Sequence, residues 1–121
     1  MSFKTLKAYQ KGFDVAMKCF EVSKSFPSEE KFGLTSQIRR SSRSVCAQIG
    51  EGYRKRKYPK YFVSKMVDAD GENSETMIWV DFAFECAYIN EETKFELANS
   101  IEEIGKLLNY MIDNPGKFGA V

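Results

Sequence analysis

The stretch LTSQIRRSSRSVCAQIGEGYRKRKYPKY, residues 34–61, decides the fold because it holds a helix, a turn and the start of a second helix. Its large apolar residues recur at a helical spacing and share one face: Leu34, Ile38, Val45, Ile49 and Tyr53. Small residues lie on or beside that face and predict close approach of a neighbouring helix: Ser41, Ser42, Cys46 and Gly52. Pro59 suits the first turn of a helix. The stretch therefore predicts a helical hairpin.

Three further blocks have helical periodicity. Residues 5–26 carry an apolar stripe made of Leu6, Tyr9, Phe13, Met17 and Phe20. Residues 59–88 carry a second stripe, with Phe62, Met66, Ala69, Asn73, Met77, Val80, Phe84 and Ala87. Residues 91–113 carry the most regular one, with Leu97, Ile101, Ile104, Leu108 and Met111.

Four amphipathic helices joined by short connections predict an all-α protein, an antiparallel up-down-up-down four-helix bundle. We expect helices over residues 5–26, 35–56, 59–88 and 91–113, in a single domain covering residues 1–121. Asn114, Pro115 and Gly116 end the last helix, and residues 115–121 are expected to form a flexible tail.

Positive charge is concentrated in one part of the chain. Between Arg39 and Lys60 there are eight basic residues and one acid, Glu51, a local net charge of +7 in a chain whose total is +1. A localised positive field attracts anions even where the net charge is near zero. The sequence therefore indicates an anionic partner without naming it.

Catalytic and metal chemistry find little support. The chain has no histidine, which removes the commonest general base and metal ligand. It has no glycine-rich phosphate loop and no nucleophile motif, and its three cysteines lack zinc spacing. We therefore expect no enzyme activity, no catalytic residue, no cofactor and no metal. The odd, widely spaced cysteines and the lack of an apolar span predict a cytoplasmic protein with reduced thiols and no membrane segment.

Acidic residues follow at matching positions of the hairpin. If the chain reverses around residues 57–58, Arg39, Arg40 and Arg43 come near Glu72 and Glu75. We expect structural ion pairs between these arginines and glutamates, which would fix the packing register. A metal site formed by the carboxylates of residues 68–75 is the weaker alternative.

The cations at the end of the second helix have no comparable acidic neighbours. They are Arg54, Lys55, Arg56, Lys57 and Lys60. They could be a solvated helix end, where cations complement the helix dipole. They could instead contact nucleic-acid phosphates, with Tyr53, Tyr58 and Tyr61 close enough to stack on bases.

Several of these residues form a pattern that resembles a known family. Phe26-Pro27, Glu30, Gly33-Leu34-Thr35 and Gln37-Ile38-Arg39-Arg40 make the string FPxxExxGLTxQIRR, and residues 44–52 add a second match. The chain resembles the bacterial four-helix bundle proteins first described from intervening sequences in genes for 23S ribosomal RNA. It departs from them at residues 48–52, QIGEG in place of Asn-Ile-Ala-Glu-Gly.

The resemblance implies a homopentameric ring, and for some relatives a reverse transcriptase and nucleic acid as partners. We therefore expect a non-enzymatic oligomer that binds RNA or DNA backbone through the basic end of its second helix. Trp79 and Phe82 lie off the main stripe of their helix and would form an exposed apolar patch in a monomer. The alternative is a protein-interaction scaffold whose cations dock an acidic partner or a neighbouring subunit.

Overall fold

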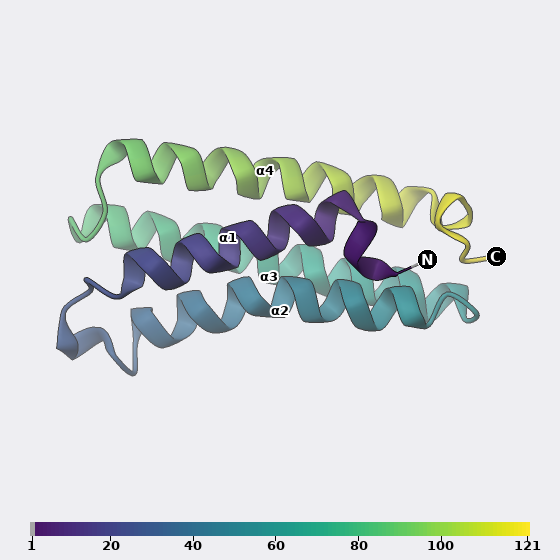
Figure 1. Cartoon of the computed structure of the whole chain (residues 1–121), viewed down its shortest axis with the longest axis horizontal. Helices are drawn as coiled ribbons and strands as arrows, with labels where there is room; N and C mark the ends of the chain where they lie inside the picture. The colour runs from purple at the N-terminus through teal and green to yellow at the C-terminus, as the bar shows by residue number, and fades with distance from the viewer. Residues whose placement is uncertain (1) are drawn as a thin grey trace.

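The computed structural model describes residues 2–121 and contains four long helices (Figure 1). They are α1 Lys7–Ser23, α2 Leu34–Arg54, α3 Pro59–Glu85 and α4 Glu91–Asp113. Short 3₁₀ helices are η1 Phe3–Thr5, η2 Ser28–Glu30 and η3 Pro115–Phe118. No strand occurs within residues 2–121, so the predicted all-α class is confirmed.

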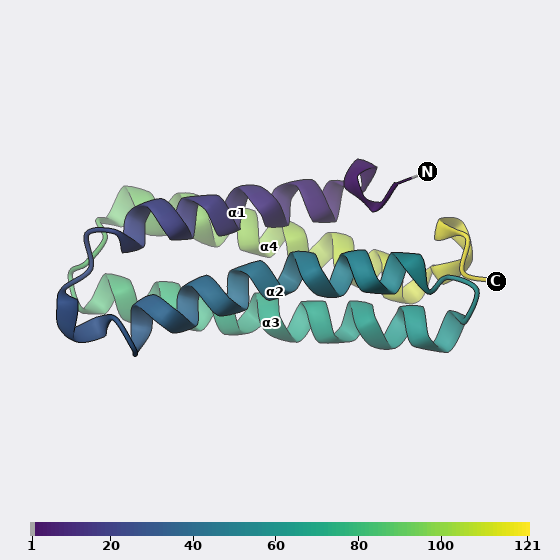
Figure 2. The same cartoon turned by 60° about the horizontal axis from the view of Figure 1, so that its bottom comes forward.

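Successive helices run in opposite directions and pack side by side (Figures 1 and 2). α2 contacts α1 and α3, while α4 contacts α3 and α1, so that α1 and α3 occupy diagonal corners. This is the predicted four-helix bundle. The turn between α2 and α3 lies at the same end of the bundle as both chain termini.

Three helices end earlier than their sequence patterns indicate. α2 ends at Arg54 instead of residue 56. α1 ends at Ser23, and the chain then turns before Pro27 instead of continuing to residue 26. α3 ends at Glu85 because Ala87 adopts a left-handed conformation with φ of 61°. At the start of α4 the boundary is as expected, since the Asn90 side chain accepts a hydrogen bond from the Thr93 backbone at 2.8 Å.

The residues of the FPxxExxGLT string hold the connection between α1 and α2. Phe26 packs against Tyr88 with ring centroids 5.3 Å apart. Glu30 accepts two hydrogen bonds, from the Leu34 backbone at 3.1 Å and from the Tyr88 hydroxyl at 3.0 Å. The second bond raises the pKa of Tyr88 to about 12, because the carboxylate stabilises the protonated phenol.

The apolar stripes of α2 and α4 face the core, as predicted. All five large apolar residues predicted for each helix are buried. Ser41 and Ser42 of α2 are buried as well, and Ser41 makes a 2.8 Å hydrogen bond to Thr76 of α3. Gly52 permits the close approach of these two helices, because a β-carbon there would lie 2.7 Å from Cβ of Lys65.

The face of α1 that is buried in the core is not the one that carries its large apolar residues Phe13 and Met17. Its buried residues are small or medium-sized: Ala8, Gly12, Val15, Ala16, Cys19 and Ser23. Phe13 is 50% exposed and Met17 46%. An apolar stripe at helical spacing normally marks the core side of a helix. Here only its first members, Leu6 and Tyr9, pack against the core.

The expected flexible tail is instead part of the fold. Residues 115–118 form η3, and Ala120 is buried. The Phe118 ring packs against Phe62 and Tyr110, with centroid distances of 6.4 and 6.1 Å. The prediction for residues 115–121 is therefore wrong, since aromatic packing holds this segment over the end of the core.

Candidate nucleic-acid interface

The turn between α2 and α3 carries a cluster of exposed cations, which we call the basic turn: Arg54, Lys55, Lys57 and Lys60. α2 ends at Arg54, and the chain reverses through hydrogen bonds from the Lys55 backbone to Gly52 and from the Tyr58 backbone to Lys55. Pro59 then starts α3. Within residues 2–121, no carboxylate forms an ion pair with any of the four cations.

Arg56 does not belong to this exposed set, although the sequence places it there. Its guanidinium donates hydrogen bonds to the backbone carbonyls of Tyr53, at 2.8 Å, and Phe118, at 3.2 Å. It also stacks on the Tyr53 ring, 3.8 Å from the centroid. Arg56 therefore holds η3 against the end of α2 and is not a free cation of the turn. Its predicted contact with phosphate stays a prediction.

Two of the three expected stacking tyrosines are accessible. Tyr58 and Tyr61 are exposed, whereas Tyr53 is buried beneath Arg56. Lys55 and Lys65 place their ammonium groups 5.9 and 5.7 Å from the centre of the Tyr61 ring. The basic turn thus combines unpaired positive charge with two exposed aromatic faces.

A salt bridge marks the edge of the basic turn. Lys65 of α3 donates to Glu51 at 2.8 Å and to Gln48 at 3.0 Å, both on α2. The interaction with Glu51 raises the pKa of Lys65. Glu51, the single acid of the basic stretch, is therefore engaged by a lysine of α3 and does not neutralise the basic turn.

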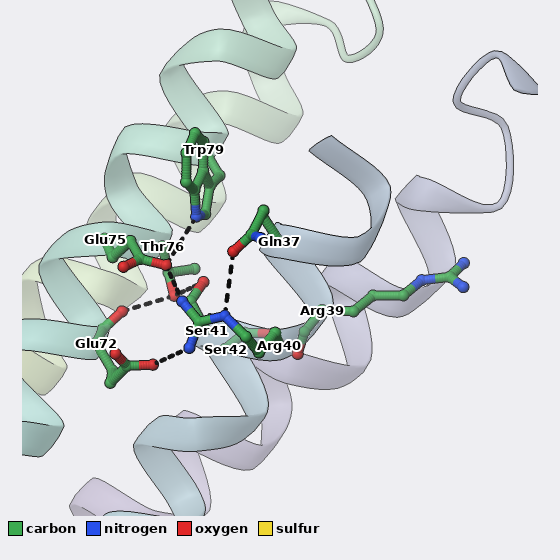
Figure 3. Close-up of polar contacts among 9 residues, drawn as sticks. All are labelled: Gln37, Arg39, Arg40, Ser41, Ser42, Glu72, Glu75, Thr76 and Trp79. Carbon is green, nitrogen blue, oxygen red and sulfur yellow. Dashed lines mark hydrogen bonds and ion pairs between the residues drawn. The ribbon is translucent and has the colours of Figure 1, made fainter. Parts of the chain in front are cut away.

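Arg40 makes the ion pairs that the hairpin register predicts (Figure 3). Its guanidinium donates to Glu72 at 2.8 Å and also to Glu75. The pair with Glu72, and secondarily the field of Glu75, raises the pKa of Arg40. Two further contacts complete the cluster, from Arg40 to Gln37 at 3.1 Å and from Trp79 to Glu75 at 3.1 Å.

Arg39 and Arg43 lie on the side of α2 that faces α1, so their predicted pairing with Glu72 and Glu75 within the chain is wrong; pairing across an interface, the other form of that prediction, stays a prediction. Figure 3 shows Arg39 extending away from the Arg40 cluster. Arg39 donates to Ser23 of α1 at 2.7 Å. Both guanidinium groups lie over the Phe20 ring, 4.8 and 5.7 Å from its centroid. Lys24 approaches the same ring at 4.7 Å, which makes a cluster of three cations around one phenyl group.

We next consider metal sites, reactive thiols and membrane-spanning helices in the part of the chain that the structure describes. Residues 2–121 contain no group of three or more Cys, Asp or Glu placed to hold a metal ion. Burial raises the pKa of Cys19 to about 12 and that of Cys46 to about 11, which keeps both thiols protonated. No helix in that range is long and apolar enough to span a membrane.

Two hollows beside α1 have no counterpart in the sequence analysis. One, of about 390 Å³, lies between Tyr9 of α1 and Cys46, Gly50 and Arg54 of α2. The other, of about 360 Å³, lies between Tyr9, Phe13 and Asp14. The signal that could have found them is the small residues of α1, Gly12 and Ala16, which occupy the core positions and leave the large side chains outside.

Comparisons with known proteins agree with the fold. Residues 4–110 match the family model described as 23S rRNA-intervening sequence protein. A crystal structure of a protein of unknown function from the S23 ribosomal protein family of Bacteroides thetaiotaomicron is similar, with a TM-score of 0.78 and 28% sequence identity. The similarity covers 88% of this chain and 95% of that one. A comparison with curated proteins finds no match.

Proposed function

Since the chain belongs to the 23S rRNA-intervening sequence protein family, we propose that it is a non-enzymatic, self-associating bundle that binds the backbone of RNA or DNA. The basic turn is the binding surface, and its exposed, unpaired cations are the observation that carries the proposal. The setting we propose is the cytoplasm, with a homopentamer as the assembly that the family resemblance implies.

The charges of the original stretch divide into two groups. Arg39, Arg40 and Arg56 make hydrogen bonds within the protein, and Arg43 lies over the Phe20 ring. The four cations of the basic turn have no carboxylate partner within residues 2–121, so they keep the field that attracts phosphate. Exposed Tyr58 and Tyr61 add faces on which unpaired bases can stack.

Contacts of this kind position a nucleic acid without reading its sequence, because phosphate is the same at every nucleotide. We therefore expect binding with little sequence preference. Single-stranded segments should bind better than uninterrupted duplex, since only unpaired bases offer their faces to Tyr58 and Tyr61.

A salt-titrated binding measurement tests the proposal. Fluorescence anisotropy with a labelled single-stranded RNA should give a linear fall of log K with log salt. The Lys55→Ala/Lys57→Ala/Lys60→Ala variant should reduce that slope by about 2, since each phosphate contact on a single strand contributes about 0.7.

The matched control removes three exposed lysines elsewhere, in Lys7→Ala/Lys31→Ala/Lys106→Ala, with the same change of net charge. It should leave the slope unchanged. Equal losses in both variants would show that only net charge matters. Absence of binding at low salt would reject the nucleic-acid proposal in favour of the interaction scaffold, in which the same cations dock an acidic protein.

A further inference from the structure

Two exposed apolar stripes lie on diagonal corners of the bundle. The α1 stripe consists of Phe13 and Met17, both about half exposed, with the partly buried Tyr9 and Phe20 at its two ends. The α3 stripe consists of Val67, Ile78 and Phe82, all about half exposed. Because α1 and α3 do not contact each other, the two stripes belong to different faces of the molecule. Exposed apolar patches of this kind mark interaction surfaces.

The two stripes have borders of opposite charge. The α1 stripe ends in the cluster of Lys24, Arg39 and Arg43 around Phe20. Lys24 pairs with Glu21 at 3.4 Å, whereas neither arginine forms an ion pair within the described residues. The α3 stripe is bordered by three exposed carboxylates, those of Asp68, Asp81 and Glu85. Among these acids only Asp81 forms a direct ion pair within the described residues, with Lys94 at 4.0 Å, while Asp68 acts at longer range on Lys65. The cations beside the α1 stripe and the carboxylates beside the α3 stripe are therefore complementary in charge.

We propose that a second copy of this chain occupies these faces, with the α1 stripe of one subunit packed against the α3 stripe of the next. The inference rests on the self-association in the proposed function and specifies its surfaces. The α3 face packed against itself would oppose acids in either orientation, and the α1 face packed against itself in parallel would oppose cations; both cost binding energy. A contact between two different faces is heterologous, and repetition of such a contact closes a ring when the rotation allows it.

The positions of the two faces along the bundle agree with this arrangement. Phe20 lies near the end of α1, and Asp81 and Glu85 lie near the end of α3. Both helices run in the same direction, so these residues occupy the same end of the bundle (Figure 1). A rotation about an axis parallel to the bundle preserves height. It therefore brings the cations around Phe20 to the acids beside Phe82, and the stripes, about 16 and 22 Å long, alongside each other.

Two double variants test this pairing. The α1-face variant is Phe13→Glu/Met17→Glu, and the α3-face variant is Ile78→Glu/Phe82→Glu. The matched control is Phe32→Glu/Phe95→Glu, which changes two exposed aromatic residues outside both stripes. Sedimentation velocity at micromolar concentration should give the wild type and the control the mass of several chains, and each face variant the 13.9 kDa of one chain.

Mixing the two face variants gives the decisive result. One intact α1 face and one intact α3 face are then available, so the mixture should form a species of two chains and nothing larger. A mixture that stays at one chain, or face variants that keep the wild-type mass, would overturn the pairing while leaving self-association in place. A wild type that sediments as one chain would overturn self-association itself, as part of the proposed function.

A charge reversal keeps the test valid if a face variant fails to fold. Arg43→Glu is expected to weaken self-association about tenfold, because it places a carboxylate against the acids of α3. Glu85→Arg in the same chain should restore it. Failure of the second change to restore association would overturn the orientation proposed for the two faces.

Discussion

α4 and α1 are helices of similar amphipathic pattern that use their large apolar residues in opposite ways. On α4, Leu97, Ile101 and Ile104 are buried, together with Leu108 and Met111. On α1, Phe13 and Met17 are exposed while Gly12 and Ala16 face the core. The difference teaches that an apolar stripe predicts a surface to be covered. It does not say whether the same chain or another one covers it.

The small size of the inward side chains explains why the large residues of α1 point away from the core. Gly12 lets α1 lie close to α2, since a β-carbon there would be 3.3 Å from Sγ of Cys46 and 3.5 Å from Cγ1 of Val45. A Phe or Met turned inward at that separation would overpack the core. The large residues of α1 are therefore kept outside, where the second copy proposed above would cover them.

Truncation of one large residue on each helix should give the greatest contrast. Leu108→Ala removes a fully buried side chain of α4 and should lower the free energy of unfolding by about 2–5 kcal/mol. Met17→Ala should change it by no more than about 0.5 kcal/mol, because Met17 is half exposed. Urea denaturation in the Ile78→Glu/Phe82→Glu background measures both without a contribution from self-association.

Comparable losses at the two positions would mean that the α1 stripe contributes to the core of the single subunit. The contrast between the helices would then disappear, and with it the main reason for assigning the α1 stripe to an interface.

An enlarged side chain at Gly12 tests why α1 is turned this way. Gly12→Leu should lower the free energy of unfolding by about 1–3 kcal/mol in the same background, because the new side chain meets Cys46 and Val45. The control Asp14→Leu, at an exposed position of α1, should stay within about 0.5 kcal/mol. A neutral Gly12→Leu would show that α1 moves away from α2 at little cost.

Periodicity was sufficient to predict the hairpin, its register and the stripes of α2 and α4. Arg40 meets Glu72 and Glu75 because residues on facing antiparallel helices are set by distance from the turn. The sequence could not tell which side of α2 each arginine takes. Arg39 precedes Arg40 by one residue, and a rotation of about 100° directs it to Phe20 on α1 instead.

The candidate site was predicted less well, for a local reason. A run of adjacent cations looks uniform in the sequence, but the end of a helix exposes some of its side chains and turns others inward. Arg56 is turned inward because the carbonyls of Tyr53 and Phe118 and the Tyr53 ring lie within its reach. No pattern in the sequence announces the Phe118 contact, which joins residues 62 positions apart.

The reactivity of the thiols tests directly which face of α1 is buried, although the expected effect is small. Cys19 lies on the buried face of α1, whereas Cys86 is exposed at the end of α3. In the Ile78→Glu/Phe82→Glu background at pH 8, a thiol reagent should modify Cys86 rapidly and Cys19 slowly. Cys86→Ser should remove the fast phase, and a fast phase that survives would place Cys19 or Cys46 at the surface.

The buried thiol of Cys19 predicts a loss of stability at alkaline pH. Burial raises the pKa of Cys19 from 9.0 to about 12, so between these values the folded chain holds a proton that the unfolded chain has lost. Stability is therefore complete below pH 9 and falls as the pH rises towards 12. Cys19→Ala should make the decline shallower in urea titrations across this range. If the slope did not change, Cys19 would titrate as an ordinary thiol, and α1 would have to face the core with a side other than Cys19.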